Sequence, residues 1–559
     1  MSMQNRDYKS LFYLLLFATF VVNFVQAATT GILSDEAYYG LYGANLSWGY
    51  FDHPPVVGLL VHISSLFFDG ALGIRFATTL IHLVTLSLLW RLTDDRSPDR
   101  SRVILFFVLA SATVMFSVYG FATTPDAPLL LFTALFLLAY RRFLQQESAA
   151  NIFWLALSMS GMVYSKYQAA LVIGFVILSN LRLLLNLRFW LSGFLGLALL
   201  FPHFYWQYAH DFPGFKYHLV DRAGAFKWRY IYEYIPNEMA VFNPFVLGAA
   251  IYLLFRFKAK DKEERAYYFL ITGFLLFFWL TGFRGHIEPH WTIAAAIPML
   301  VLIYRRSLEH PPLLRYVRRF IFPSLLLVMA ARVAVVVNPD IKYAAGFDKR
   351  KAEYLLTSRV AGNLPVLYTG SFQAPSMYSY FTGKKCFLLS SLDTRRTQFD
   401  FWQWERDFHN KPVFVCADIP GRSRKYSCNG TTISGFRADS LQTVTRMELT
   451  YTQPPVVMRA GQTIALRLTL HNPYPHAIRF RHREFPVTLS AAFLFRKETH
   501  LQPIHTDVPL IALQPGSSVS LSVSFVVPPL PAGKYHFGIS LTNPLGASLN
   551  GPFTPITLK

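Results

Sequence analysis

The sequence predicts a polytopic α-helical membrane protein with a small mixed α/β segment and a C-terminal all-β, immunoglobulin-like sandwich. Three observations predict this fold class. The 559 residues are 53% hydrophobic and only 15% charged, which is too apolar for an ordinary soluble domain. Apolar runs long enough to cross about 30 Å of hydrocarbon recur up to about residue 337 and then stop. Beyond residue 441, apolar and polar residues alternate with a period of two.

The apolar runs predict about eleven spans within residues 1–337, the predicted transmembrane domain. They lie at 11–28, 71–90, 103–120, 127–140, 152–164, 168–185, 189–206, 241–255, 267–283, 291–304 and 320–337. Arg6 and Lys9 before the first run also fit a secretory signal peptide. The run is long for a signal peptide, however, and the polar motif that directly follows it in the sequence is typical of a functional part of a membrane protein.

Lysine and arginine are unequally distributed between the two sets of alternate loops. With the N-terminus in the cytoplasm, the inner segments hold twenty of them and the outer loops up to residue 290 hold seven. Basic residues collect on the cytoplasmic side, so the asymmetry predicts an inner (plasma) membrane protein whose residues 338–559 are periplasmic. It also accounts for the formal net charge of +21 without a nucleic-acid partner.

The periplasmic part is predicted to form two domains, 338–440 and 441–559. Strand-like runs at 366–368 and 413–415 lie between helical stretches and indicate a mixed α/β segment. Alternating runs at 464–470, 519–525 and 535–541, separated by Pro- and Gly-containing turns, indicate the sandwich. All the cysteines lie in this part; Cys416 with Cys428 is a candidate disulfide, although the other pairings stay open.

The first outer loop is acidic in a basic protein. Asp35 and Glu36 directly follow the first span, and ionisable groups at membrane depth are costly enough to need a reason. Neighbouring residues on a helix diverge by about 100°, so one of the two can face a given substrate atom as a general base, while helix capping is the alternative for either. Further along, Asp52 and His53 could bind a divalent metal or a phosphate; the alternative for Asp52 is a turn before two prolines. Residues 36–48 and 54–68 are expected to form two short helices.

Ionisable side chains also mark the other outer loops, namely Asp126, Lys166, His218 with Arg222, and His290. Loops that converge on one face predict a polar cavity at the outer membrane surface, whereas a transport pathway would place such groups at the midplane. Each residue has a structural alternative. These are an Asx-type turn for Asp126, a snorkelling side chain for Lys166, a solvated loop for His218 and an interfacial loop for His290.

At these motifs the chain resembles the bacterial polyprenyl-phosphate-sugar glycosyltransferases of the GT-C fold. More narrowly, it is similar to the family grouped with protein O-mannosyltransferases and lipid A aminoarabinose transferases. Residues 35–39 (Asp-Glu-Ala-Tyr-Tyr) are similar to the family's first-loop acidic motif, whose aspartate is taken as catalytic. Residues 49–55 (Gly-Tyr-Phe-Asp-His-Pro-Pro) are similar to its second motif, in which the aminoarabinose transferases have a metal-binding glutamate and a lysine near phosphate. Asp52 and His53 occupy those two positions here.

The resemblance implies roles for later residues as well. Asp126 would support catalysis, Lys166 would bind the donor headgroup, and His218 and Arg222 would contact metal and phosphate. Residues 288–291 and 395–399 are also similar to segments of this family, without an assigned role. The resemblance covers residues 10–420 and leaves the sandwich outside. Tyr38 stands where the aminoarabinose enzymes carry arginine, which argues against that substrate.

These observations lead to the hypothesis of an integral membrane glycosyltransferase. It would move a hexosyl or pentosyl group from a polyprenyl-phosphate donor, with inversion, to an envelope lipid, glycan or protein at the periplasmic face. The assigned residues are Asp35, Asp126 and Glu36 for catalysis, Lys166, Arg222, His53 and His290 for the donor phosphate, and Asp52 and His218 for a divalent metal ion.

Two other hypotheses stay open. A transporter or flippase of lipid-linked sugars would share the headgroup site but would not need Asp35. A membrane-anchored envelope assembly protein would use the membrane part only as an anchor, for which one span would suffice.

Overall fold

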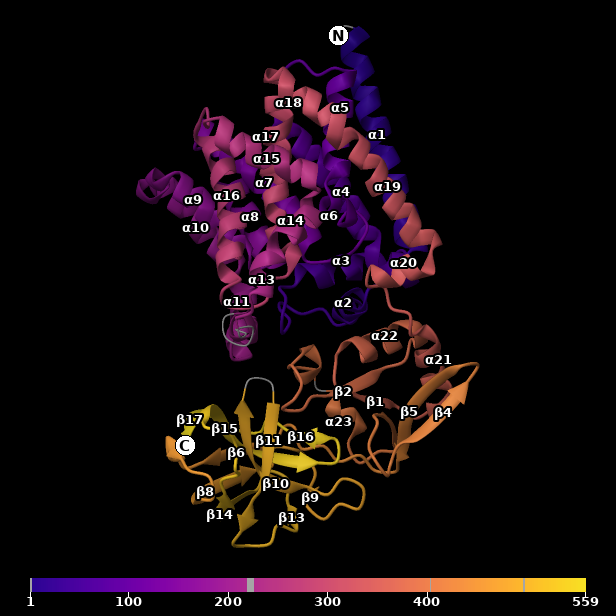
Figure 1. The fold of residues 1–559 in the computed structure, drawn as a ribbon, viewed down its shortest axis with the longest axis vertical. Coiled ribbons are helices and arrows are strands. Elements are labelled where there is room, and N and C mark those ends of the chain that lie inside the picture. Colours follow the sequence, from indigo (N-terminus) through magenta and orange to yellow (C-terminus); the bar gives the residue numbers. More distant parts are fainter. Residues whose placement is uncertain (1–2, 219–225, 403, 496–497) are drawn as a thin grey trace. The chain divides into compact units, whose positions relative to one another are not determined.

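The structure is a computed structural model that describes residues 3–218, 226–402, 404–495 and 498–559 (Figure 1). The chain forms two compact units, Met1–Asp348 and Lys349–Lys559. From Lys349 onward, the predicted domains 338–440 and 441–559 lie together in the second unit. Their separation into two domains therefore stays a prediction.

The first unit is helical. Its α-helices are α1 (Met3–Thr29), α2 (Ser34–Ala44), α3 (Val56–Ser65), α4 (Gly70–Thr93), α5 (Arg100–Ala112), α6 (Val114–Val118), α7 (Asp126–Gln145), α8 (Ala149–Ser165), α9 (Ala169–Ser179), α10 (Leu187–Leu199), α11 (Phe201–Ala209), α12 (Pro213–Lys216), α13 (Arg229–Tyr232), α14 (Tyr234–Phe242), α15 (Pro244–Arg256), α16 (Lys262–Thr281), α17 (Ala296–Glu309), α18 (Pro311–Tyr316), α19 (Phe322–Val337) and α20 (Pro339–Ala344). Shorter 3₁₀ and π turns are η1 (Leu181–Leu185), η3 (Pro289–Ala295) and η4 (Val317–Ile321).

Apolar helices of membrane-spanning length confirm the predicted class of the first unit. Among the described residues, five helices are long and apolar enough to cross a membrane, or up to seven if each of two bent pairs is one span. The bends are 50° between α10 and α11 and 105° between α14 and α15. The predicted number of eleven spans is not confirmed, because segments such as α9 (Ala169–Ser179) are shorter than a span requires.

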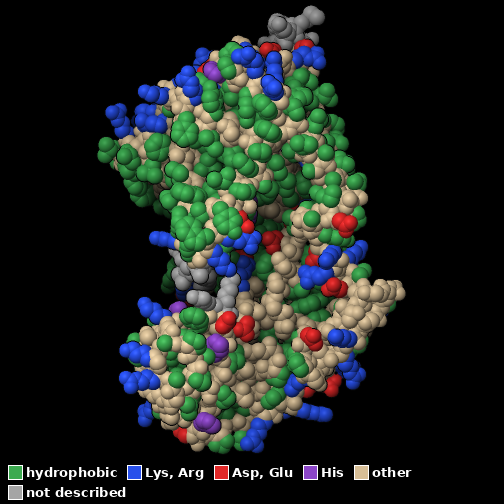
Figure 2. All heavy atoms as spheres, in the orientation of Figure 1, with side chains coloured by type: hydrophobic (Ala, Val, Ile, Leu, Met, Phe, Trp, Pro, Cys, Tyr) green, Lys and Arg blue, Asp and Glu red, His purple; other side chains and the backbone are tan. Residues whose placement is uncertain are grey.

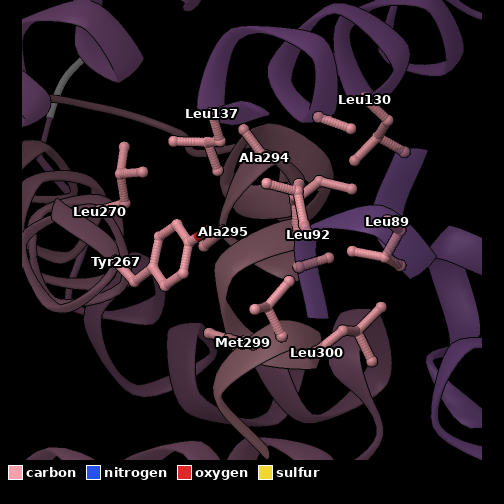
Figure 3. Close-up of a cluster of buried hydrophobic side chains, with 14 of the residues drawn as sticks. Leu89, Leu92, Leu130, Leu137, Tyr267, Leu270, Ala294, Ala295, Met299 and Leu300 are labelled. Atoms are coloured by element: carbon pink, nitrogen blue, oxygen red, sulfur yellow. The ribbon is translucent and has the colours of Figure 1, made fainter. Parts of the chain in front are cut away.

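The apolar core of the first unit lies where α4, α7, α16 and α17 meet (Figure 3). Leu89, Leu137, Leu270 and Met299 come from these four helices and are fully or almost fully buried. The segment Pro289–Glu309 is mostly buried, so it is the centre of the bundle.

The outer helices of this unit are apolar and exposed. Most of α1 and of the segment Pro311–Val337 is not covered by protein, although both are strongly hydrophobic. Figure 2 shows hydrophobic side chains over the visible face of this unit, with Lys and Arg gathered toward the end that carries the N-terminus. Exposed apolar surface of this extent is typical of contact with lipid.

A buried ion cluster ties three helices together. Glu263, at the start of α16, accepts a 2.7 Å hydrogen bond from Nε of Arg141 on α7 and a 3.1 Å bond from Nη2 of Arg305 on α17. These arginines belong to the predicted inner loops, so part of the basic charge there holds the helices in place.

The second unit begins with an α/β layer. Its helices are α21 (Lys351–Ala361), α22 (Gln373–Thr382) and α23 (Glu405–Phe408), with a 3₁₀ turn η5 (Gln398–Asp400). Its strands are β1 (Val366–Thr369), β2 (Cys386–Leu389), β3 (Val413–Cys416), β4 (Arg424–Cys428) and β5 (Thr431–Ala438), in the sheet order β2-β1-β3-β5-β4. Strand β1 pairs in parallel with β2 and β3, and β5 pairs antiparallel with β3 and β4. The predicted strands 366–368 and 413–415 are thus observed as β1 and β3.

The rest of the second unit is all-β. Its strands are β6 (Glu448–Tyr451), β7 (Val457–Met458), β8 (Thr463–His471), β9 (Ile478–Arg479), β10 (Thr488–Phe495), β11 (Glu498–Pro503), β12 (His505–Thr506), β13 (Ala512–Leu513), β14 (Ser518–Val526), β15 (Gly533–Asn543), β16 (Gly546–Ala547) and β17 (Thr554–Leu558). One sheet has the order β11-β10-β15-β17-β7 and another the order β12-β14-β8-β6. Phe525 of β14 stacks on Phe537 of β15 at 5.3 Å between ring centroids, so the two sheets share one core. The predicted β-rich region is confirmed, while its immunoglobulin-like topology stays a prediction.

The candidate disulfide is not formed. Cys386, Cys416 and Cys428 are all free. Strand β5 lies between β3, which ends at Cys416, and β4, which ends at Cys428. Strands two positions apart in a sheet are about 10 Å apart, which is beyond the reach of a disulfide.

Candidate functional site

The predicted first outer loop folds into the two predicted short helices, α2 and α3. Figure 1 shows them at the end of the first unit opposite the N-terminus. Pro55 is the residue before α3, in keeping with proline at a helix start. A side chain at Gly43 would come within 2.7 Å of Val61, so glycine allows the two helices to pack closely. This pairing gives the acidic loop a rigid framework.

Glu36 is turned into the protein. It is fully buried and forms an ion pair with Arg75 of α4, whose Nε lies 2.7 Å from Oε1. Its oxygens also accept backbone N–H bonds from Leu33 at 3.0 Å and from Thr123 at 2.9 Å. One carboxylate therefore caps α2, neutralises a buried arginine and fixes the loop that leads to Asp126. These contacts favour the helix-terminus alternative for Glu36 over the predicted catalytic role.

Three carboxylates lie near enough to Tyr39 to raise its pKa. Burial raises the pKa of Tyr39 well above its ordinary value. The nearby negative charges raise this pKa further, and they belong to Asp35, Asp52 and Asp126. These acids come from three places in the sequence, so the structure brings the first-loop motifs and the second outer loop together. Asp35 is exposed, in contrast to its neighbour Glu36.

Asp52 is held by aromatic side chains. The hydroxyl of Tyr42 donates a 2.6 Å hydrogen bond to Oδ1 of Asp52, and the Tyr42 ring stacks on Tyr50 with centroids 3.8 Å apart. Nε2 of His53 lies 3.2 Å from the hydroxyl of Tyr39, which places His53 on the same cluster. The second first-loop motif thus points its acid and its imidazole toward the tyrosines of α2.

Asp126 and Lys166 form a buried pair. Asp126 begins α7, Lys166 follows the last residue of α8, and Nζ lies 2.7 Å from Oδ1. Nε2 of His290 lies 3.9 Å from the other oxygen, Oδ2. Three predicted site residues from three loops therefore meet, as the predicted topology requires. Asp126 accepts a hydrogen bond from one N–H of the Lys166 ammonium group, which has two further N–H groups to donate.

The predicted metal ligands Asp52 and His218 lie next to each other. Nε2 of His218 lies 3.0 Å from the backbone oxygen of Asp52. Across residues 3–218, 226–402, 404–495 and 498–559, no three His, Cys, Asp or Glu side chains are placed to hold a metal ion. The described residues thus supply no ready-made set of three ligands, and a divalent ion at Asp52 and His218 stays a prediction.

Arg222, the remaining predicted phosphate ligand, lies outside the described residues. Sequence reasoning did not assign roles to Arg75, Thr123 or Tyr39. Arg75 carried a detectable signal, because it is a lone charge near the start of an apolar run, where a buried partner is required.

The comparisons with known proteins agree with this architecture. Residues 52–206 match the sequence profile of the family described as dolichyl-phosphate-mannose-protein mannosyltransferase. No curated protein sequence matches the chain. The crystal structure of ArnT from Cupriavidus metallidurans in the apo state is similar with a TM-score of 0.55 at 12% identity, covering 76% of this chain and 98% of that one. ArnT from Cupriavidus metallidurans bound to undecaprenyl phosphate gives a TM-score of 0.54 at 13% identity, covering 77% and 97%. The chain therefore has the fold of ArnT, which confirms the predicted multi-pass GT-C fold.

Proposed function

We propose that this chain is an integral membrane glycosyltransferase that moves a hexosyl or pentosyl group from a polyprenyl-phosphate donor to an envelope lipid, glycan or protein. The observation that carries the proposal is an exposed Asp35 and two buried carboxylates that all act on Tyr39, one of the two buried acids being paired with a lysine. The shared fold with ArnT, which has been solved with undecaprenyl phosphate, supports a lipid-phosphate donor. The matched family profile supports sugar transfer.

In the proposed reaction, Asp35 is the general base. Its carboxylate takes the proton of an acceptor hydroxyl while the hydroxyl oxygen attacks the anomeric carbon from the face opposite the phosphate. The bond between this carbon and the phosphate oxygen breaks, its electron pair stays on the phosphate, and the configuration inverts. General base catalysis of this kind contributes about 10²–10⁴-fold in rate.

Lys166 would stabilise the leaving phosphate. Asp126 holds its Nζ in place, and the remaining N–H groups can donate to phosphate oxygens. His290 lies 3.9 Å from Asp126 and His53 lies 3.2 Å from the Tyr39 hydroxyl, and both would add donors when protonated. Glu36 becomes a positioning residue, since its contacts fix α2 and the Asp126 loop. A divalent ion at Asp52 and His218 stays a prediction, as do the phosphate contact of Arg222, the periplasmic orientation and the identity of the membrane.

The test is envelope analysis of a deletion strain complemented with variants. We expect the deletion to lose one sugar from a lipid, glycan or protein, the wild-type chain to restore it, and Asp35→Asn to fail although it inserts normally. Asp69→Asn is the matched control, because Asp69 is exposed in the same outer loop and does not act on Tyr39. Restoration by Asp35→Asn would overturn the proposal and favour a flippase, which has no need for a base.

A further inference from the structure

A cavity of about 340 Å³ lies within the second unit. It is lined by strand β2, the segment 390–402, and residues Arg446, Leu494 and Leu549 from the β-rich region. Its volume is in the range of small-molecule pockets. The segment 395–399, for which the transfer chemistry offers no role, contributes Arg396 and Phe399 to the wall.

Part of the cavity lining is aromatic. Phe399, Phe401 and Trp402 line it, and Trp402 is stacked on Trp404 with centroids 4.4 Å apart and planes within 12°. Phe399 meets the Trp402 ring edge-on at 5.2 Å. Packing against two rings fixes the orientation of the Trp402 indole at the cavity wall.

Another part of the lining is polar and internally hydrogen-bonded. Glu405 accepts hydrogen bonds from the Tyr474 hydroxyl at 2.7 Å and from Nε of Arg446 at 3.1 Å. Arg446 in turn donates from Nη2 to the backbone oxygen of Trp402 at 3.1 Å, which joins the polar wall to the aromatic one. Asp400 accepts the backbone N–H of Thr397 at 2.7 Å through Oδ2.

This lining selects for one kind of ligand. A lipid chain would leave the carboxylates and guanidinium groups desolvated, which is costly. A small anion would gain nothing from the rings and would be repelled by Asp400 and Glu405. Arg396 and Arg446 balance these acids, so the wall carries no net charge to attract a highly charged ligand. A neutral ligand with an apolar face and many hydroxyl groups remains, and a sugar ring has both.

We propose that this cavity binds a saccharide, with the C–H face of a sugar ring on Trp402 and its hydroxyl groups hydrogen-bonded to Asp400 and Arg396. The second unit would then be a glycan-binding module in the same chain as the transferase. The site goes beyond the proposed transfer reaction, because it binds without turnover and needs none of the first-unit acids.

The experiment measures binding to the full chain in lipid nanodiscs, since many detergents are themselves glycosides. The probes are neutral trisaccharides of glucose, mannose and N-acetylglucosamine, and saturation-transfer NMR and calorimetry report binding. We expect at least one to bind, Trp402→Ala to weaken binding at least about tenfold, and Trp402→Phe to retain part of it. Arg396→Ala should also weaken binding, whereas the matched control Arg437→Ala, whose side chain is 65% exposed, should not.

Several outcomes separate this proposal from its rivals. Absence of binding for all three trisaccharides, or wild-type binding by both Trp402→Ala and Arg396→Ala, would overturn it. Binding of a nucleoside or a peptide in place of the trisaccharides would also overturn it. Asp35→Asn should bind saccharide as the wild type does, so failure of the transfer reaction and failure of this site are distinguishable.

Discussion

Glu36 and Asp35 are adjacent acids, but we expect substitution of Glu36 to lower stability and substitution of Asp35 to lower the transfer rate. Glu36 and Arg75 are both completely buried, and breaking a buried ion pair by removing one partner costs about 3–5 kcal/mol. Glu36→Gln also turns an amide N–H₂ toward N–H donors that need an acceptor, which adds to this cost. Since whole proteins are stable by about 5–15 kcal/mol, this loss is a large fraction of the total. Asp35→Asn changes an exposed side chain and should alter stability by less than about 0.5 kcal/mol, while the transfer rate falls about 10²–10⁴-fold.

Two measurements on each variant test this contrast. Thermal unfolding in nanodiscs gives the change in stability, and transfer from a polyprenyl-phosphate sugar, normalised to folded protein, gives the change in rate. The double variant Glu36→Gln/Arg75→Gln removes both charges and should unfold at a higher temperature than Glu36→Gln alone, because no unpaired arginine is left buried. If Glu36→Gln has wild-type stability and loses only its rate, the positioning role is refuted and Glu36 is catalytic after all.

Three further predictions concern other contacts. Tyr42→Phe removes the 2.6 Å hydrogen bond to Asp52 but keeps the stacked ring. We therefore expect the free energy of unfolding, measured by thermal unfolding, to fall by about 1.5–3 kcal/mol and the transfer rate to fall as well. Lys166→Met leaves Asp126 buried without its cation. The double variant Lys166→Met/Asp126→Asn should therefore unfold at a higher temperature than Lys166→Met, while neither variant transfers sugar. Equal unfolding temperatures of the two variants would contradict the buried ion pair. Burial lowers the pKa of His409 from 6.5 to about 3. As the pH falls, His409 is therefore protonated in the unfolded chain before it is protonated in the folded one. The free energy of unfolding should thus fall by about 2 kcal/mol between pH 6.5 and pH 5. In His409→Gln the decline in unfolding temperature over this range should be smaller by the corresponding amount.

Local patterns were enough to predict much of the second unit. The strands β1 and β3 follow from short apolar runs between turns, and β8, β14 and β15 follow from alternation, since a strand with one buried face needs an apolar residue at every second position. The number of spans was harder to predict because hydropathy does not report bends. Asn243 has a φ of 77° and is followed by Pro244, and the chain turns there by 105° between α14 and α15.

The site was predictable in its location but not in its pairings. Counting basic residues put Asp35, Asp52 and Asp126 on one side of the membrane, and the structure gathers them around Tyr39. Which acid meets which cation depends on helix packing. Arg75 reaches Glu36 across 39 residues of sequence and Lys166 reaches Asp126 across 40, so no local pattern contains that information.

Chemically similar acids have different proposed roles here because they have different partners. The Glu36 carboxylate is fully buried and already accepts hydrogen bonds from an arginine and two backbone N–H groups, so it is not placed to reach an acceptor hydroxyl. Asp126 is likewise committed to Lys166, and its removal would free a cation that the departing phosphate requires in place. Asp35 is exposed, and a base must be able to reach the hydroxyl that it deprotonates. Burial, rather than residue type, therefore separates the proposed base from the acids that position it.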